Sequence, residues 1–432
     1  MGQDMERVDE MLKPLMVSRK YNQMPNRILL VGNGFDLACH LPTKYANFIH
    51  TVDFLIEDYE EFMNSVGHVF GNAKLQKTDP FIKECYNFNR KLFDQKFLKK
   101  EDVEKICSLL KDNEWYHYFK DTLQNENAGW VDFEKEIVRA LNHFEEFFKL
   151  VEKNLNSHMG FKTTSISYAF VSTYFHYLDE MDFDMPLSNL VVQDYLKEEI
   201  PDVEFYNLDY EKIVKELVME MDDIREALKL YIHCFAEFDL PNPEIRLNPC
   251  REYEYVFSLN YTDTIEKAAL DLKVIHIHGN TEGEIVLGIN ENDEDELDNL
   301  NTRFIPFKKY YQRVRYKTDE DYLWKIHVMK CDWIDENSSL SSVLKPKEPI
   351  KYDLEIFGHS LDVTDKGIIK DLFDLSEHIL IYYHEESQIG TYIKNLISIF
   401  GKKAFDELRY KKGLSFLPTS ACPLFTKKET VE

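Results

Sequence analysis

The chain has 432 residues, of which 44% are hydrophobic and 30% are charged, and it is long enough to bury a sizeable core in two or three domains. Its 78 acidic residues outnumber its 52 basic residues and give a net charge of −26, so we do not expect non-specific binding to nucleic acid. Seven scattered cysteines without a Cys-x-x-Cys pair favour a reducing compartment. Residues 1–20 are too charged for a signal peptide, and no apolar run is long enough to cross a bilayer. We therefore expect a cytoplasmic protein that does not contact a membrane.

The first clear strand lies after a predicted amphipathic helix in residues 1–26. Its apolar residues 28–31 run directly into Gly32-Asn33-Gly34, and a helix-compatible stretch follows. This order predicts a buried parallel strand, a tight turn and a helix N-terminus, which together bind phosphate in nucleotide-binding α/β folds. The third glycine of the dinucleotide fingerprint would fall at Leu37, so a tight connection without a ligand is the competing interpretation.

Asp36 has two candidate roles in this stretch. A carboxylate near a helix start is favoured by the helix macrodipole, but it would repel a bound diphosphate. We therefore expect Asp36 either to cap the helix or to contact a ribose.

The middle of the chain has the apolar spacing of helices and little alternation of strands with helices. A helix is expected to begin after Asp132, a plausible N-cap, and a possible extra strand lies at 204–208. We interpret residues 51–249 as a helical insertion. Its many aromatic residues are compatible with a homo-oligomer, although no heptad seam supports one.

An α/β rhythm returns after residue 250. Strands are expected at 253–259, 274–277, 285–287, 353–357 and 379–383, with helices between several of them. The predicted fold class is α/β, a Rossmann-type parallel sheet with a large helical insertion. Its discontinuous core takes in residues 1–50 and 250–400, and residues 401–432 form a polar C-terminal tail.

Polar residues follow three of these later strands. They are Asn260-Tyr261-Thr262-Asp263, His278-Gly279-Asn280 and Gly358-His359-Ser360-Leu361-Asp362. The carboxyl ends of parallel strands line one crevice, so these groups are expected to converge with the first turn on one ligand. His276 alternates with His278 and is expected to share its strand face, but a metal site there lacks an identifiable third ligand, and no metal is expected. A basic cluster interleaved with tyrosines at residues 308–317 is interpreted as a solvated helix face.

In order, these motifs are similar to those of the AbiH phage abortive-infection family, whose members look like sirtuin-like NAD-binding domains. The matching stretches are residues 31–43, Asn260-Tyr261-Thr262, residues 276–279 and residues 357–365. The resemblance spans Arg27 to about Tyr383. It implies a sirtuin-like fold and an antiviral protein that hydrolyses NAD to nicotinamide and ADP-ribose, with a phage-derived trigger as a partner.

The resemblance also implies roles for individual residues. His278 would be the general base, and Asn260 would hold a ribose hydroxyl or the attacking water. The N–H groups of residues 32–35 would take the diphosphate, and Ser360 with the Gly358 backbone would contact the adenosine ribose. The remaining expected NAD contacts are Phe35, Asp36, Thr43, Tyr261, Asp263, Gly279, His359 and Asp362.

The chain departs from sirtuin deacetylases at several positions. The zinc-binding cysteines are absent, Thr43 and Lys44 replace an acid and an arginine, and Thr262 replaces an acid that Asp263 follows one step later. These differences argue against acyl-lysine removal and leave NAD hydrolysis as the simpler activity. A non-catalytic sensor of NAD or ADP-ribose and a nuclease-type effector are the alternatives.

Overall fold

The computed structural model describes ten segments of the chain: residues 26–57, 100–125, 132–154, 196–200, 205–236, 246–247, 253–268, 274–289, 302–330 and 351–426. They belong to two compact units that alternate along the sequence. The first unit takes in residues 1–39, 240–277 and 319–432, and the second takes in residues 40–239 and 278–318. The helix expected in residues 1–26 lies almost wholly outside the described residues.

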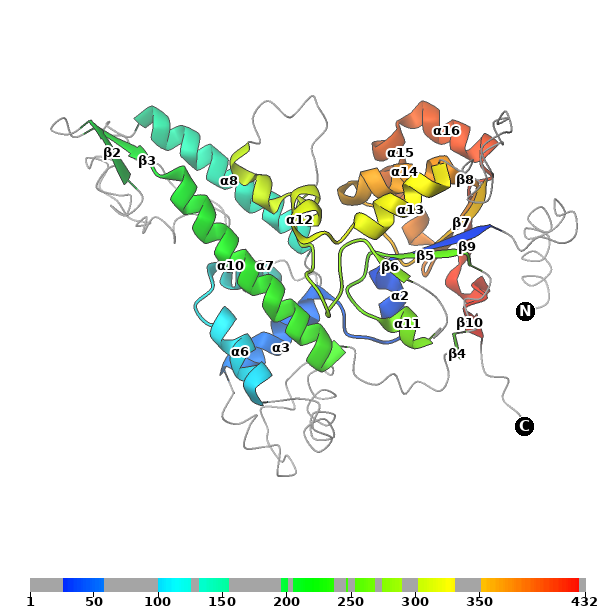
Figure 1. Ribbon diagram of the computed structural model, residues 1–432, viewed down its shortest axis with the longest axis horizontal. Helices are drawn as coiled ribbons and strands as arrows, with labels where there is room; N and C mark the ends of the chain where they lie inside the picture. Colours follow the sequence, from blue (N-terminus) through cyan, green and yellow to red (C-terminus); the bar gives the residue numbers. More distant parts are fainter. Residues whose placement is uncertain are drawn as a thin grey trace, which may run out of the picture. The chain divides into compact units, whose positions relative to one another are not determined.

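The first unit is built on a six-stranded parallel sheet (Figure 1). Its strands are β1 (Arg27–Val31), β5 (Tyr255–Ser258), β6 (Val274–His276), β7 (Tyr352–Phe357), β8 (Ser376–Tyr383) and β9 (Ser415–Pro418). The spatial order is β6-β5-β1-β7-β8-β9, and every neighbouring pair is parallel. Counted along the chain, this is the order 3-2-1-4-5-6 of dinucleotide-binding folds, whose topological switch point falls between β1 and β7. The predicted α/β fold with a parallel sheet is confirmed.

Helices cover the sheet because its strands are apolar on both faces. Residues 28–31 of β1 are all fully buried, as expected for a central parallel strand. The helices of one face, which share an apolar cluster with the strands, are α13 (Glu320–Lys330), α14 (Lys366–Leu375), α15 (Ser387–Phe400) and α16 (Lys402–Lys411). Two short helices, α2 (Asn33–Ala38) and α11 (Thr264–Ala268), follow β1 and β5. The ring of Phe35 in α2 meets the ring of Phe357 edge-on, with centroids 5.6 Å apart.

A buried carboxylate lies in the middle of this sheet. Glu355 of β7 accepts hydrogen bonds from the hydroxyls of Tyr253 at 2.7 Å and Tyr382 at 3.0 Å, and an Arg27 nitrogen lies 3.8 Å away. Burial raises the pKa of both phenols, so they remain protonated donors. A buried charge is tolerated only when it is paired and hydrogen-bonded, and Glu355 satisfies both conditions.

Two parts of the first unit differ from the sequence expectation. Residues after 401 were expected to form a tail, but they supply α16 and the edge strand β9. β9 has only four residues and ends at a proline, so its position depends on pairing with β8 rather than on a local pattern. A pair of two-residue strands, β4 (Arg246–Leu247) and β10 (Phe425–Thr426), lies apart from the sheet, as do the 3-10 helices η6 (Val363–Asp365) and η7 (Thr419–Ala421).

The second unit is mainly helical, as predicted for the middle of the chain. Its helices are α3 (Tyr45–Glu57), α6 (Lys100–Leu110), α7 (Glu114–Asn125), α8 (Phe133–Asn154), α10 (Tyr210–Tyr231), the π-helix η4 (Ile232–Ala236), the 3-10 helix η5 (Thr302–Phe307) and α12 (Lys309–Tyr316). An antiparallel pair, β2 (Leu196–Ile200) and β3 (Phe205–Leu208), accompanies them. The ring of Phe133 stacks on Tyr45 at 4.2 Å and on Phe119 at 4.1 Å, so aromatic residues join α3, α7 and α8. No helix among the described segments is both long and apolar enough to span a bilayer.

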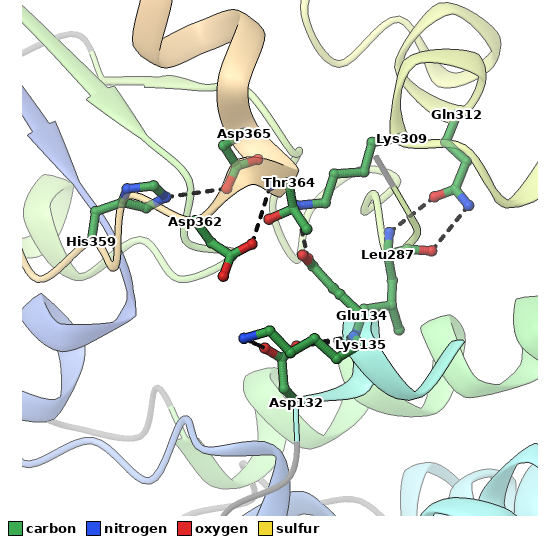
Figure 2. Close-up of polar contacts among 10 residues, drawn as sticks. All are labelled: Asp132, Glu134, Lys135, Leu287, Lys309, Gln312, His359, Asp362, Thr364 and Asp365. Atoms are coloured by element: carbon green, nitrogen blue, oxygen red, sulfur yellow. Dashed lines mark hydrogen bonds and ion pairs between the residues drawn. The ribbon is translucent and has the colours of Figure 1, made fainter. Parts of the chain in front are cut away.

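Asp132 caps α8, as the sequence predicts. Its Oδ1 accepts from the N–H groups of Glu134 at 3.2 Å and Lys135 at 3.4 Å. Glu134 in turn binds the ammonium of Lys309 at 2.8 Å (Figure 2). Lys309 is only 3% exposed, so the basic cluster at 308–317 is not the continuous solvated face that was expected.

The expected strand at 285–287 does not form in the second unit. The segment is fully buried, but the side chain of Gln312 takes the place of a neighbouring strand (Figure 2). Its Oε1 accepts from the Leu287 N–H at 2.9 Å, and its Nε2 donates to the Leu287 carbonyl at 3.0 Å. The Gln312 side chain therefore makes the two hydrogen bonds that the Leu287 main chain would otherwise make to a neighbouring strand.

Candidate functional site

The glycine turn after β1 is bound to the end of β7. The Gly32 N–H donates to the Phe357 carbonyl at 3.0 Å, and the Gly34 N–H donates to the Gly358 carbonyl at 2.8 Å. The Phe35 N–H donates to the Gly32 carbonyl at 2.8 Å. Three of the N–H groups predicted to take a diphosphate therefore bind main-chain oxygens, and a diphosphate would have to replace those bonds.

Close packing explains why glycine occupies these positions. A Cβ on Gly34 would lie 2.6 Å from the Gly358 Cα. Gly358 has a φ of +70°, and a Cβ there would lie 2.3 Å from the Phe35 nitrogen. The two turns meet at the topological switch point with no room for a side chain on either of these glycines, so the motif has a structural role whether or not a ligand binds.

Asp36 ties α2 to the loop after β5. It is 1% exposed, and its Oδ2 accepts a hydrogen bond from the Thr262 hydroxyl at 2.8 Å. The Thr264 hydroxyl donates to the Thr262 hydroxyl at 3.0 Å. Gly32 is the N-cap of α2 and no side chain caps the helix, so the expected capping role of Asp36 is wrong. Its second candidate role, contact with a ribose, stays a prediction.

Burial raises the pKa of the Asp36 carboxyl. Loss of solvation raises the pKa of its carboxyl from 3.8 to about 7, although the side chains of Thr262, Thr264 and Asn260 and the charge of His276 oppose the shift. Its Oδ1 is buried and has no hydrogen-bond partner among the described residues. The group therefore changes its charge near neutral pH.

Asn260 is fixed in place by three of its polar groups. Its N–H donates to the Ser258 hydroxyl at 3.1 Å, and its side-chain Nδ2 donates to the Gly32 carbonyl at 3.1 Å. Its carbonyl lies 2.9 Å from Nδ1 of His276. Asn260 is 7% exposed, and its Oδ1 accepts no hydrogen bond from the described residues. The amide oxygen is therefore the acceptor left to meet a ligand.

His276 links Asn260 to an acid. Its Nε2 lies 2.6 Å from Oε1 of Glu266 in α11. Burial alone lowers the pKa of His276, but the hydrogen bond and charge of Glu266, the Asn260 carbonyl and the charge of Asp263 outweigh it and raise the pKa above its ordinary value. The folded protein therefore keeps His276 protonated to a higher pH than an ordinary histidine.

The loop after β7 uses its polar side chains to build its own turn (Figure 2). Nδ1 of His359 accepts from the Leu361 N–H at 3.0 Å, so Nε2 carries the proton and donates to Asp365 at 3.1 Å. Asp362 accepts from the Thr364 N–H at 3.2 Å and caps η6. Ser360 is exposed, and its carbonyl accepts from the side chain of Asn395 at 2.9 Å. Within this loop the Ser360 hydroxyl is therefore the group best placed to meet a ligand.

The remaining predicted residues divide between the two units. In the first unit, Tyr261 is half-buried, and Asp263 binds Lys267 at 2.7 Å. Thr43, His278 and Gly279 belong to the second unit. β6 ends at His276, so the strand alternation that predicted a shared face for His276 and His278 stops before the second histidine.

His278 is only 3% exposed, and its carbonyl accepts from the Val286 N–H at 2.9 Å. Gly279 has a φ of +76°, and a Cβ there would lie 1.8 Å from the Glu284 carbonyl oxygen, so this turn requires glycine. Thr43 is half-buried, and its N–H donates to the Leu41 carbonyl at 3.0 Å.

Three residues that contact Asp36, Thr262 or His276 were given no individual role from the sequence: Thr262, Thr264 and Glu266. The alternation of Asn260 and Thr262 along an extended segment was an available signal. The approach of Glu266 to His276 has no signal in the sequence, because it depends on how α11 packs. Among the segments that the structure describes, no group of three or more His, Cys, Asp or Glu side chains is placed to hold a metal.

Comparison with known proteins identifies the family. The family model described as "Bacteriophage abortive infection AbiH" matches residues 28–381, well over half of the 432 residues. No curated protein and no solved structure matches the chain. The matched range covers β1, the helical middle and the strands through most of β8. The chain therefore belongs to the AbiH family of bacteriophage abortive-infection proteins.

Proposed function

We propose that this AbiH protein acts in phage defence by hydrolysing NAD. The observation that carries the proposal is the strand-end cluster of Asn260, Asp36 and His276, in a sheet with the strand order of dinucleotide-binding folds. In open α/β sheets, ligands bind at the carboxyl ends of the strands near the topological switch point. Asn260 and Asp36 are held at the ends of β5 and β1, which is where such a ligand is expected.

The chemistry requires one oriented water. The bond between the ribose C1′ and the nicotinamide nitrogen breaks, and its electron pair leaves with nicotinamide. The water oxygen bonds to C1′, and its proton passes to a base and then to solvent. NAD and water thus give nicotinamide, ADP-ribose and one proton. The transition state resembles an oxocarbenium ion, so placing the water and the ribose hydroxyls is the main task of the protein.

The cluster supplies groups suited to that task. Nδ2 of Asn260 donates to the Gly32 carbonyl, which fixes the orientation of the amide. Its Oδ1 would then accept a hydrogen bond from a ribose hydroxyl or the attacking water. The family resemblance implies that His278 would take the proton of the water and that Asp36 would contact the ribose. The glycine turn fits a diphosphate less well, since its N–H groups already donate to carbonyls. We therefore assign the ribose, not the diphosphate, to this part of the site.

Nicotinamide release from NAD by the purified full-length chain tests the proposal. Asn260→Ala and His278→Ala should each lower the rate by about 100-fold or more, the size expected for a positioned catalytic group. Asn113→Ala is the matched control, because Asn113 is 3% exposed and its side chain makes two hydrogen bonds in the second unit, to the Glu220 carbonyl and from the Tyr116 N–H. It should keep wild-type turnover.

The test also distinguishes the alternatives. A sensor would be identified by two results together. The purified chain would bind NAD in calorimetry, and neither the purified chain nor phage-challenged cells would release nicotinamide. Metal-dependent loss of RNA or DNA without NAD loss would identify a nuclease. Equal nicotinamide release by wild type and Asn260→Ala would contradict the assigned site.

A further inference from the structure

His276 binds the main chain of Asn260, and Glu266 in turn binds His276. His276 ends β6, and its partner in the parallel register is Ser258, two residues before Asn260. Nδ1 of His276 lies 2.9 Å from the Asn260 carbonyl, while Nε2 lies 2.6 Å from Glu266. The ring therefore connects the loop after β5 to α11 through one residue.

The direction of both hydrogen bonds follows from the acceptors. A carbonyl oxygen can only accept, so Nδ1 of His276 must carry a proton. A neutral ring would then present a bare Nε2 to the Glu266 carboxylate, which is also an acceptor when ionised. A second proton on Nε2 removes this conflict and makes both bonds charge-assisted.

We propose that His276 and Glu266 form a positioning pair that aims the Asn260 amide for NAD hydrolysis. This inference rests on the proposed function for its effect on turnover. The His276 ring binds the Asn260 carbonyl, and the Gly32 carbonyl binds the Asn260 side chain, so the residue is held at both ends. Among the described residues, loss of the first contact leaves the main chain of Asn260 held only by Ser258, and a displacement of about 1 Å at a reacting group can cost about 100-fold in rate.

The pair acts through its charge, which other groups also influence. The carboxylates facing His276 are Glu266 and Asp263, with Asp36 near enough to feel its charge. Lys267 partly neutralises Asp263 at 2.7 Å. Because the pKa of His276 is raised by these partners, the charged pair is complete at low pH and is lost as the pH rises through that pKa. Turnover should fall on the alkaline side.

Two substitutions separate the contacts of the ring. In His276→Asn, the amide nitrogen replaces Nδ1 and keeps the bond to the Asn260 carbonyl but does not reach Glu266. In His276→Gln, the amide replaces Nε2 and keeps Glu266 but releases Asn260. We expect kcat to fall about 10-fold to 100-fold in His276→Gln with KM within about twofold. In His276→Asn, which keeps the bond to Asn260 but loses the charge, kcat should fall by only about threefold to 10-fold.

Glu266→Gln and His378→Gln complete the set. Glu266→Gln keeps an acceptor but removes the charge, so the alkaline limb of the kcat profile should move to lower pH. His378→Gln is the matched control, because His378 of β8 pairs with Asp353 of β7 at 3.0 Å and does not contact Asn260. Equal losses in His276→Asn and His276→Gln, or an unmoved pH profile in Glu266→Gln, would overturn the proposal.

A readout without turnover keeps this inference separate from the proposed function. The side-chain amide signal of Asn260 in the ¹⁵N-labelled full-length chain, assigned with Asn260→Asp, should shift in His276→Gln and not in His378→Gln. A shift in a chain that never cleaves NAD would support the pair and overturn the hydrolase proposal. An unshifted signal would overturn the pair even in an active enzyme.

Discussion

Replacing Asp36 by Asn should remove the loss of folding stability that ionisation of this carboxyl causes as the pH rises. The carboxyl is 1% exposed, and burial raises its pKa from 3.8 to about 7. The folded state therefore holds this proton more tightly than the unfolded chain does. Its stabilising contribution is complete below pH 3.8, decreases as the pH rises and is lost above about pH 7.

The size of the effect follows from the shift. A change from 3.8 to about 7 corresponds to about 4 kcal/mol, at about 1.4 kcal/mol for each pH unit. Asp36→Asn keeps an oxygen for the Thr262 hydroxyl and cannot ionise. The stability of the variant relative to wild type should therefore rise by about 4 kcal/mol between pH 4 and pH 8 and then level off.

Urea unfolding followed by circular dichroism at pH 4, 5, 6, 7 and 8 measures this difference. Thr262→Val is the opposing variant, because losing the hydroxyl donor raises the pKa of Asp36 further and extends the loss of stability to higher pH. A stability difference between Asp36→Asn and wild type that is flat across the range would refute the argument. So would a difference that falls with pH.

Three further substitutions test the packing around the site. Glu355→Ala should lower the free energy of unfolding by about 3 kcal/mol in urea denaturation, because it leaves two buried tyrosine hydroxyls without their acceptor. Gly358→Ala should cost more than about 3 kcal/mol in the same assay, because the residue has a φ of +70° and its Cβ would meet the Phe35 nitrogen at 2.3 Å. Gln312→Leu should cost about 1–3 kcal/mol and speed amide exchange at Leu287, whose N–H loses its buried acceptor.

Short sequence patterns predicted those parts of the fold that are determined by residues near one another in the chain. The apolar run at 28–31 before two glycines correctly gave a buried parallel strand and a turn, because both follow from residue type and spacing. The Asp132 cap was predictable for the same reason. β9 was not, because four residues ending in proline carry no pattern and gain their place only by pairing with β8.

The candidate site was predictable in its location but not in its contacts. The positions of Gly32, Asn260 and Gly358 after strands indicated one edge of the sheet, and the described strand order agrees with that. The assignment of Asp36 as a cap failed because the helix begins three residues earlier, at Asn33, and the carboxyl instead faces Thr262. That contact joins residues 226 positions apart, so no local rule could have predicted it.

The most direct test of the central claim measures NAD, nicotinamide and ADP-ribose by mass spectrometry in phage-challenged cells that express the full-length chain. Cells with the wild-type chain should lose NAD and gain nicotinamide and ADP-ribose in equal amounts as defence begins. Cells with Asn260→Ala, matched in expression to Asn113→Ala, should keep their NAD and lose protection. Protection by the wild-type chain with unchanged NAD would contradict the account.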